Sequence, residues 1–521
     1  GSPDAQMSIR VRGGGSITQS NEPLFIVDGF PVESISDIPP TDIESIDVLK
    51  DASSTAIYGA RGANGVIIVT TKSGKEGKVS VSYNAYYAWK KVAKTLDVLS
   101  ASDYTKWQYE LAQLTNKNDD YIKYFGNYQD LDMYDNVATN DWQDLTFGRT
   151  GHSFNHNLSI NGGSDKFKYS FSYSHIDDKA IMQMSDYARD NLNLKLNHKP
   201  LKNVSLDFSA RFSKTKINGG GSNDANSSLN TDKRLRYSLL YTPYPVPGIS
   251  DALNADEEDA NSLLINPLIS LRDNDTRKER INYNLAGSIT WEIIKDLKLK
   301  AEVGYDDYRN NADRYYGVTT YYVRNNVDDE DKSKPAISFT RGTRTAFRST
   351  NTLSYDFKKF FKNNKNHLNL LAGQEYIVTR ERELRNVVHG FPTEYTADDC
   401  INYSTKGNPY EVTNYGYPDD VLFSFFGRAN YDFDSKYLFS ATFRADGSSK
   451  FAKGNQWGFF PSAAVAWRIS SESFMENTKN WLDDLKLRFS YGTAGNNNIP
   501  SGQISQLYEL NKTPWINGVN S

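Results

Sequence analysis

Most of the chain alternates between apolar and polar residues. From about residue 79 to residue 492, apolar and aromatic side chains occupy every second position of successive segments, with polar residues between them. A period of two places the apolar side chains on one face of a β-strand and the polar side chains on the other. The pattern predicts about thirteen strands, with clear examples at 79–87, 167–173, 204–212, 297–305, 421–431 and 461–469.

The first 75 residues follow a different pattern. Two short apolar runs, 24–27 and 66–69, are bounded by turn residues and are typical of buried strands. Residues 53–58 begin with serine, which caps helices well, and end before Gly59, so they predict a short helix. The sequence therefore predicts a small α+β domain over residues 1–75 and a β-rich domain over residues 76–521.

The connections between the predicted strands differ in length. Short turns fall at 162–165, 199–202 and 432–435, whereas long polar connections cover roughly 92–150, 216–278, 311–336 and 380–419. A soluble sandwich or propeller also consists of half-buried strands. Regular alternation of turns with long loops, however, places all the turns at one end of the sheet, which is typical of an outer-membrane β-barrel.

The composition agrees with a barrel. Aromatic residues make up 13% of the chain although all hydrophobic residues make up only 38%, and the mean hydropathy is -0.64. No apolar stretch approaches the roughly 20 residues of a membrane helix, which excludes a helical membrane protein. Strands with one face in lipid and one in a wet lumen explain the polar average, and aromatic girdles at the membrane interfaces explain the aromatic excess.

Charge and reactive side chains exclude several functions. With 60 Lys and Arg against 64 Asp and Glu, the net charge of -4 gives no sign of a nucleic-acid-binding protein. One cysteine, Cys400, and six scattered histidines offer no disulfide within the chain, no zinc spacing and no catalytic triad. Acidic runs at 256–259 and 328–331 lack the spacing of a calcium loop. We therefore expect no catalytic site, no metal site and no cofactor.

Several motifs, in order along the chain, resemble those of one family. Three segments of the first domain resemble the plug domain of TonB-dependent outer-membrane transporters, namely 23–29 (PLFIVDG), 43–52 (IESIDVLKDA) and 57–67 (IYGARGANGVI). Three further segments resemble the SusC-like branch of that family, namely 51–65, 444–451 (RADGSSKF) and 487–496 (LRFSYGTAGN). The glycines of the plug motifs are expected at turns that need positive φ angles.

The resemblance implies the fold class and suggests that the chain is partial. It implies an all-β transmembrane β-barrel of about 22 antiparallel strands when complete, about 13 of them here, with the small α+β plug inside the lumen. An open sheet would leave unpaired edges in lipid. The chain begins Gly1-Ser2-Pro3 without a signal peptide. We therefore expect it to be the middle of a longer polypeptide, with the C-terminal part of the plug and the N-terminal part of the barrel.

The resemblance also implies a function. A SusC-like transporter imports oligosaccharides across the outer membrane of a Gram-negative bacterium, with a SusD-like surface lipoprotein as its lid and with TonB acting through a segment upstream of this chain. Oligopeptide importers share every motif quoted above, and a siderophore or cobalamin receptor would lack the lipoprotein. A soluble glycan-binding adhesin would leave the plug motifs unexplained. The expected partners are the lipoprotein, TonB, outer-membrane lipid and the substrate, without nucleic acid, and a dimer of transporter–lipoprotein pairs is a further arrangement to consider.

Two sets of candidate residues follow. Charged plug residues would pair with the barrel wall, the alternative being an ordinary solvated surface; they are Arg10, Arg12, Glu44, Asp47, Lys50, Asp51 and Arg61. Aromatic residues of the long loops suit stacking on sugar rings or peptide side chains, the alternative being packing between loops or against a lid protein. Together with two polar residues of a plug loop that faces the external cavity in the family, the ligand-contact candidates are Gln19, Asn21, Tyr124, Tyr128, Tyr134, Trp142, Tyr321 and Tyr322.

Overall fold

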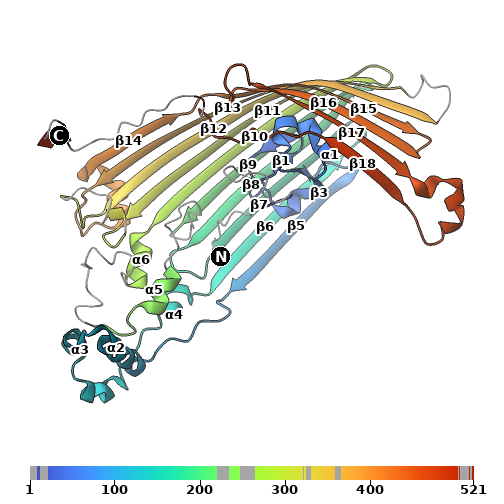
Figure 1. Cartoon of the computed structure of the whole chain (residues 1–521). Helices are drawn as coiled ribbons and strands as arrows, with labels where there is room; N and C mark the ends of the chain where they lie inside the picture. The colour runs from blue at the N-terminus through green and yellow to red at the C-terminus, as the bar shows by residue number, and fades with distance from the viewer. Residues whose placement is uncertain are drawn as a thin grey trace.

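The structure is a computed structural model, shown in Figure 1. It describes residues 9–11, 21–219, 234–246, 265–320, 322–323, 330–357, 365–502, 504, 515–516 and 519–520. Within these ranges a small mixed sheet with short helices lies against one face of a large curved antiparallel sheet.

The small domain is built around two buried strands. Its sheet has the order β2-β1-β4-β3, in which β1 and β4 are parallel and the other pairs are antiparallel. The apolar runs 24–27 and 66–69 form its central strands, as predicted, and the helix expected at 53–58 is one α-helical turn followed by a 3-10 helix. The elements are β1 (Leu24–Val27), β2 (Phe30–Val32), η1 (Pro40–Asp42), β3 (Ile43–Leu49), α1 (Ala52–Thr55), η2 (Ala56–Arg61) and β4 (Val66–Thr71).

The large sheet contains fourteen strands. Thirteen follow one antiparallel path in chain order, and β14 pairs beside the far half of β13, which agrees with the predicted count. The strands are β5 (Gly77–Lys90), β6 (Gly151–Gly163), β7 (Phe167–Lys179), β8 (Asp186–Leu201), β9 (Val204–Asn218), β10 (Thr276–Ile294), β11 (Leu297–Tyr316), β12 (Ala336–Asp356), β13 (Asn366–His389), β14 (Asn408–Gly416), β15 (Asp420–Phe433), β16 (Tyr437–Ser448), β17 (Trp457–Arg468) and β18 (Lys486–Gly492).

The two faces of the large sheet differ in polarity. On β11 the exposed face carries Leu299, Val303 and Tyr305, whereas Glu302 and Asp306 lie on the face that meets the small domain. Among the described residues, β5 and β18 each pair with a single neighbouring strand, so this part of the sheet is open between them. No helix in the described ranges has the length and apolar character needed to cross a membrane.

Most long connections gather at one end of the large sheet, as predicted (Figure 1). The connections 91–150 and 219–275 hold α2 (Ala101–Thr115), α3 (Asn118–Phe125), η3 (Tyr128–Tyr134), α4 (Trp142–Phe147), α5 (Arg234–Leu240) and α6 (Pro267–Asp273). Side chains that accept backbone N–H bonds start the helices, Ser100 at α2 and Asp141 at α4. We call this the loop end and the opposite end the turn end.

Three connections differ from the predicted alternation. The β7–β8 and β16–β17 connections, 180–185 and 449–456, are short although they lie at the loop end. The β17–β18 connection, 469–485, lies at the turn end but is longer than a tight turn, because it forms two 3-10 helices, η6 (Ile469–Ser471) and η7 (Ser473–Thr478). β13 also runs well beyond residue 380, because its last residues pair with both β12 and β14.

Candidate functional site

The small domain is seated on the large sheet by a buried ion cluster. Glu375, in the middle of β13, lies 2.9 Å from Arg61 of the small domain, 2.9 Å from Arg348 of β12 and 2.6 Å from Arg444 of β16. The Glu375 and Arg444 side chains are 4% and 3% exposed. One carboxylate therefore accepts from three guanidinium groups, and one of these belongs to the small domain.

Two further carboxylates contact the arginines of the cluster. Asp446 lies 2.6 Å from Arg444 Nε, and Glu302 lies 3.1 Å from Arg348 Nη1. The three arginines thus face three acidic side chains. Removing charged groups from water is costly, and close ion pairs such as these offset that cost. We define the ion cluster as Arg61, Glu302, Arg348, Glu375, Arg444 and Asp446.

The same cluster also forms hydrogen bonds with the backbone of the small domain. Arg444 Nη1 donates to the Ile57 carbonyl over 2.7 Å, and the Ala60 N–H donates to Asp446 Oδ2 over 2.6 Å. Arg348 also donates to the Gly29 carbonyl. Gly59 has φ +51°, and a Cβ at this position would lie 2.0 Å from Asp446 Oδ2. The turn at 57–61 can therefore lie this close to the large sheet only because residue 59 is glycine.

A strap from the large sheet closes over this turn. The strap is residues 493–502, which follow β18. Gly495 exchanges backbone hydrogen bonds with Gly59 (3.2 Å) and Ala63 (3.3 Å), and the Asn497 N–H donates to the Ala60 carbonyl over 2.9 Å. Farther along, the Ile499 carbonyl accepts from Lys450 and the Ser501 hydroxyl donates to Asp420, both at the loop end of the sheet. The turn is thereby held between the large sheet and the strap.

A second seat lies on β7 and β8. Lys195 Nζ donates to Asp28 Oδ1 over 2.8 Å and to the Thr71 carbonyl over 2.7 Å. Asp28 also accepts from the Thr71 N–H and hydroxyl, which ties β1 to β4 at the same point. Nearby, the Ser172 hydroxyl donates to Asp42 over 2.7 Å. Burial raises the pKa of Asp42, although the hydrogen bond from Ser172 opposes the rise.

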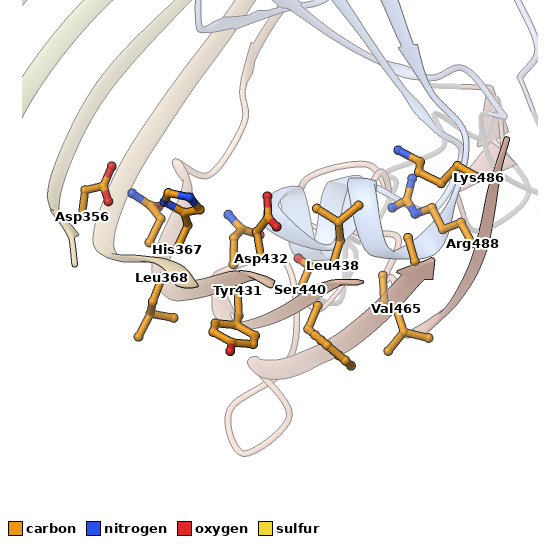
Figure 2. Close-up of a pocket in the computed structure, with 15 residues that line it drawn as sticks. Asp356, His367, Leu368, Tyr431, Asp432, Leu438, Ser440, Val465, Lys486 and Arg488 are labelled. Atoms are coloured by element: carbon orange, nitrogen blue, oxygen red, sulfur yellow. The ribbon is translucent and has the colours of Figure 1, made fainter. Parts of the chain in front are cut away.

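A hollow of about 500 Å³ lies at the turn end of the sheet (Figure 2). Asp356 and His367 lie on one side of it, and Lys486 and Arg488 of β18 lie on the other. Arg488 Nη2 is also 3.3 Å from Asp51 of the small domain. The small domain therefore borders this hollow through an ion pair that is partly exposed.

Comparison with known proteins identifies the family. The model of the TonB-dependent Receptor Plug Domain matches residues 1–66, and the model of the TonB dependent receptor-like β-barrel matches residues 218–520, which is more than half of the chain. The chain belongs to the TonB-dependent receptor family. The small domain is its plug, and the large sheet is its barrel wall. Receptors of this family reside in the outer membrane of Gram-negative bacteria.

The relatives of this receptor confirm the resemblance to the SusC-like branch. TonB-dependent receptor SusC of Bacteroides thetaiotaomicron is 31% identical over 536 residues, covering 96% of this chain and 48% of the relative. TonB-dependent receptor P3 of Formosa agariphila is 30% identical over 537 residues, covering 100% of this chain and 49% of the relative. The chain thus spans about half the length of the curated relatives it matches.

Solved structures support the fold of the receptor. The RagAB peptide importer in its open-open state aligns with a TM-score of 0.78 at 24% identity, covering 98% of this chain and 57% of that chain. A second structure, the RagAB peptide transporter, aligns with a TM-score of 0.74 at 23% identity, covering 94% of this chain and 56% of that chain. At these identities the likeness concerns the fold, which is the barrel with an internal plug that the sequence predicts.

Among the charged plug candidates that the structure describes, Arg61 and Asp51 contact the barrel wall. Arg61 joins the ion cluster, and Asp51 pairs with Arg488. Glu44 lies 3.9 Å from Lys75 on an exposed surface. The remaining described candidates, Arg10, Asp47 and Lys50, are exposed, and Arg12 lies outside the described residues. β3, which carries Glu44 and Asp47, is an edge strand of the plug sheet.

Sequence reasoning missed the wall residues that receive the plug. Glu375, Arg348 and Lys195 each occupy a polar-face position of a strand, where the alternation predicts only some polar residue. Arg444 and Asp446 fall inside the 444–451 motif, which resembles the family but does not show what its charges contact. The available signal was the unusual placement of charges at the centre of long strands, but one sequence does not show which plug residue each charge meets.

The aromatic ligand candidates in the first long loop pack within that loop or against the second long loop. Tyr134 donates to the Phe125 carbonyl, and Trp142 Nε1 donates to the Thr242 carbonyl, each over 2.9 Å. Tyr124 borders the buried cluster formed by the two longest loops, whereas Tyr128 is 48% exposed. The cluster consists of Ala101, Tyr104, Ala112, Tyr121, Phe125, Tyr244 and Val246. Burial raises the pKa of both Tyr121 and Tyr244 to about 12.

The other ligand candidates are scattered. Tyr322 stacks on Tyr316 with ring centroids 4.3 Å apart, and its hydroxyl lies 3.0 Å from His389 Nε2. Asn21 is partly buried just before β1. Gln19 and Tyr321 lie outside the described residues. Within the described part of the chain these candidates therefore do not gather into one site, and a ligand contact for each of them stays a prediction.

The single cysteine of the chain gives a first test of the loop structure. Cys400, on α8 (Ala397–Asn402), is fully buried, and burial raises its pKa to about 12. Only the thiolate reacts readily with maleimides. We expect no labelling of Cys400 at pH 8 in the folded receptor and complete labelling in urea, measured by peptide mass spectrometry. An added cysteine at exposed Thr405 should label at once; equal labelling of both positions would contradict the buried placement.

Proposed function

We propose that the full-length protein is a transporter that imports oligosaccharides across the outer membrane. In this proposal a SusD-like lipoprotein covers the loop end, and TonB acts on the plug through a segment upstream of this chain. Residues 1–75 form the C-terminal part of the plug, and residues 76–521 form the N-terminal part of the barrel. The observation that carries the proposal is the seating of the plug on the polar face of the wall through the ion cluster.

A polar interface between the plug and the barrel wall suits a plug that must move. An interface closed by apolar side chains would expose apolar surface to water whenever it opened, at a cost that grows with the area. Polar groups that separate form hydrogen bonds with water instead, so a hydrogen bond to a charged group contributes only about 1.5–3 kcal/mol net. The contacts of Arg61, Asp51 and Asp28 are of this kind. Energy delivered by TonB could therefore release these contacts stepwise and form them again.

The comparisons support two classes of cargo. SusC-type relatives at about 30% identity favour the oligosaccharide proposal. An oligopeptide importer is the second candidate, because the RagAB structures, described as a peptide importer, share the fold. A siderophore or cobalamin receptor is less well supported, since the sequence matches are to the SusC type. Membership of the receptor family argues against a soluble adhesin.

Possible contacts with cargo lie in the loops and at the turn end. We propose that Tyr128, the most exposed of the described ligand candidates in the first loop, meets the substrate at the loop end. The hollow beside Arg488 lies next to the plug on the side where a substrate would leave (Figure 2). Tyr124, Tyr134, Trp142 and Tyr322 would then act by shaping the loops, and a dimer of transporter–lipoprotein pairs remains part of the proposal.

A reversible lock between plug and wall tests the transport proposal. Asp51 and Arg488 face each other across the plug–wall boundary, and both are partly exposed. In the full-length protein, Asp51→Cys combined with Arg488→Cys, joined by a bis-maleimide that contains a disulfide, should reduce import to background. A reductant should restore it. Import is measured as cellular uptake of fluorescent oligosaccharides and, in parallel, of fluorescent peptides.

The single variants provide the matched controls for this lock. D51C and R488C treated with the same reagent should import at nearly the rate of the untreated protein, and buried Cys400 should not react. Uptake that continues when mass spectrometry shows complete crosslinking would overturn the proposal. Uptake of labelled peptides without uptake of labelled oligosaccharides would replace the oligosaccharide cargo by the oligopeptide alternative.

A further inference from the structure

The outer face of the wall changes from apolar to charged within a few residues near the loop end. Strand pairing aligns rows of side chains across β10 to β13 on the face opposite the plug. One row is apolar: Leu285, Tyr305, Phe347 and Val378. The next row toward the loop end on the same face is Tyr283, Asp307, Thr345 and Arg380, and the row after it is Ile281, Arg309, Thr343 and Arg382.

The position of this change fits the edge of a lipid bilayer. On β11 the outer face is apolar from Leu297 to Tyr305, and Leu299, Val303 and Tyr305 are 36%, 51% and 41% exposed. At about 3.4 Å per residue and a tilt of roughly 40°, this stretch spans on the order of 20 Å, close to the apolar band of a membrane barrel. Arg309 follows four residues later, which places it at the level of the lipid headgroups.

Three arginines surround two threonines in these rows. Thr343 of β12 is paired with Arg309 on one side and with Arg382 on the other, and Thr345 is paired with Arg380. Because neighbouring strands are about 4.8 Å apart, Arg309 and Arg382 are separated by roughly 10 Å at the backbone. Arg380 lies two residues from Arg382 on the same strand. We call Arg309, Arg380 and Arg382, with the two threonines between them, the basic patch.

The present partners of the basic patch leave its guanidinium groups accessible. Arg309 is 2.9 Å from Asp307, and Arg380 is 2.8 Å from Asp419. These arginine side chains are 53% and 66% exposed, so the two pairs are weak and open to exchange. Arg382 is exposed, and it has no ion pair with any residue in the described part of the chain. The three arginines outnumber the two carboxylates that they contact.

We propose that the basic patch binds a phosphate group of a lipid in the outer leaflet. Arginine binds phosphate through two parallel N–H donors, and the two threonines add hydroxyl donors at the centre of the patch. The apolar rows directly below would hold the acyl chains of the same lipid, so headgroup and chains meet surfaces of matching chemistry. The proposal rests on the membrane location within the proposed function but is independent of which substrate is imported.

Native mass spectrometry of the full-length protein tests this site. The protein is stripped of lipid in detergent and titrated with diphosphoryl lipid A, with the same lipid lacking its phosphates, and with inorganic phosphate. We expect tight binding of the phosphorylated lipid only. The R309Q/R380Q/R382Q variant should bind it on the order of 100-fold more weakly, at roughly fivefold for each arginine removed. Arg382→Gln alone, which breaks no ion pair within the described part of the chain, should lose several-fold.

A charge-matched control separates a site from general attraction. Lys91, Lys94 and Lys106 are exposed in the first long loop, and K91Q/K94Q/K106Q should keep the affinity of the native protein. Equal binding by the patch and control variants, or equal binding of the lipid without phosphates, would overturn the proposal. Binding of inorganic phosphate alone that the patch variant loses would assign the patch to free phosphate and also overturn it. Substrate import is not measured, so failure here is distinct from failure of the proposed function.

Discussion

Replacing Glu375 with alanine is expected to weaken the seating of the plug more than replacement of any other wall residue. The substitution leaves Arg61, Arg348 and Arg444 around a site with no carboxylate at its centre. Removing one partner of a buried ion pair costs about 3–5 kcal/mol, because the remaining charges stay buried without compensation. We expect the plug of the full-length receptor to be released at a much lower urea concentration, measured by protease cleavage within residues 57–67.

Two variants show whether the effect belongs to the ion cluster. Glu375→Gln keeps the shape of the side chain but removes its charge. It should therefore lower the urea concentration of plug release nearly as much as Glu375→Ala does. Glu110→Ala removes an exposed carboxylate from α2 and should leave plug release unchanged. If Glu375→Ala and Glu110→Ala released the plug at the same urea concentration, the ion cluster would not hold the plug.

The strands could be predicted from the sequence because the face of each residue follows from its near neighbours. The alternation at 297–305 lies within β11, and the alternation at 461–469 forms the later part of β17 and ends one residue beyond it. The ends of the longest strands were less predictable. β13 extends to His389 because it pairs with β12 and β14 beyond the point where the alternation is clear. Pairing between strands, which one sequence does not display, sets those ends.

Of the contact between the plug and the wall, only the plug residue could be predicted from the sequence. Arg61 was a candidate because a charged plug residue inside a polar lumen needs a partner. Its partner, Glu375, lies 314 positions away, and nothing in its neighbourhood distinguishes it from another polar-face carboxylate such as Glu302. The burial of Glu375 among three arginines arises only when β12, β13 and β16 are assembled. The local sequence pattern therefore identifies charged plug residues such as Arg61, but the tertiary structure determines which wall residue each of them contacts.

The loop aromatics show that a side chain can have a packing role that the sequence does not reveal. Tyr134 and Trp142 were proposed as ligand contacts because aromatic side chains in polar loops often meet ligands. In the structure the second long loop supplies Tyr244, which packs against Tyr134, and the Thr242 carbonyl, which accepts from Trp142. Trp142 and Thr242 are a hundred residues apart, and nothing in the local sequence of either shows that the two loops meet.

Gly59→Ala is expected to displace the plug turn from the wall. The added Cβ would lie 2.0 Å from Asp446 Oδ2 and 2.7 Å from Arg444 Cδ, and the backbone has φ +51° and ψ -119°. Neither side chain can move away cheaply, because both are held in the ion cluster. Backbone strain of about 1–3 kcal/mol and overpacking of about 1–3 kcal/mol together predict a loss of several kcal/mol. Urea-induced release of the plug, followed by protease cleavage, measures the loss.

A second glycine separates the contact from the backbone strain. Gly126, at the end of α3, has φ +77°, and a Cβ there would meet nothing within 4 Å. Gly126→Ala therefore introduces backbone strain but no steric clash, and it should leave plug release unchanged. Gly59→Ala should also weaken the strap, because Gly495 bonds to the carbonyl of residue 59. If both variants released the plug equally easily, the wall contact at residue 59 would contribute nothing. A large effect confined to Gly59→Ala would place the tightest point of the seat where Asp446 and the strap enclose the turn.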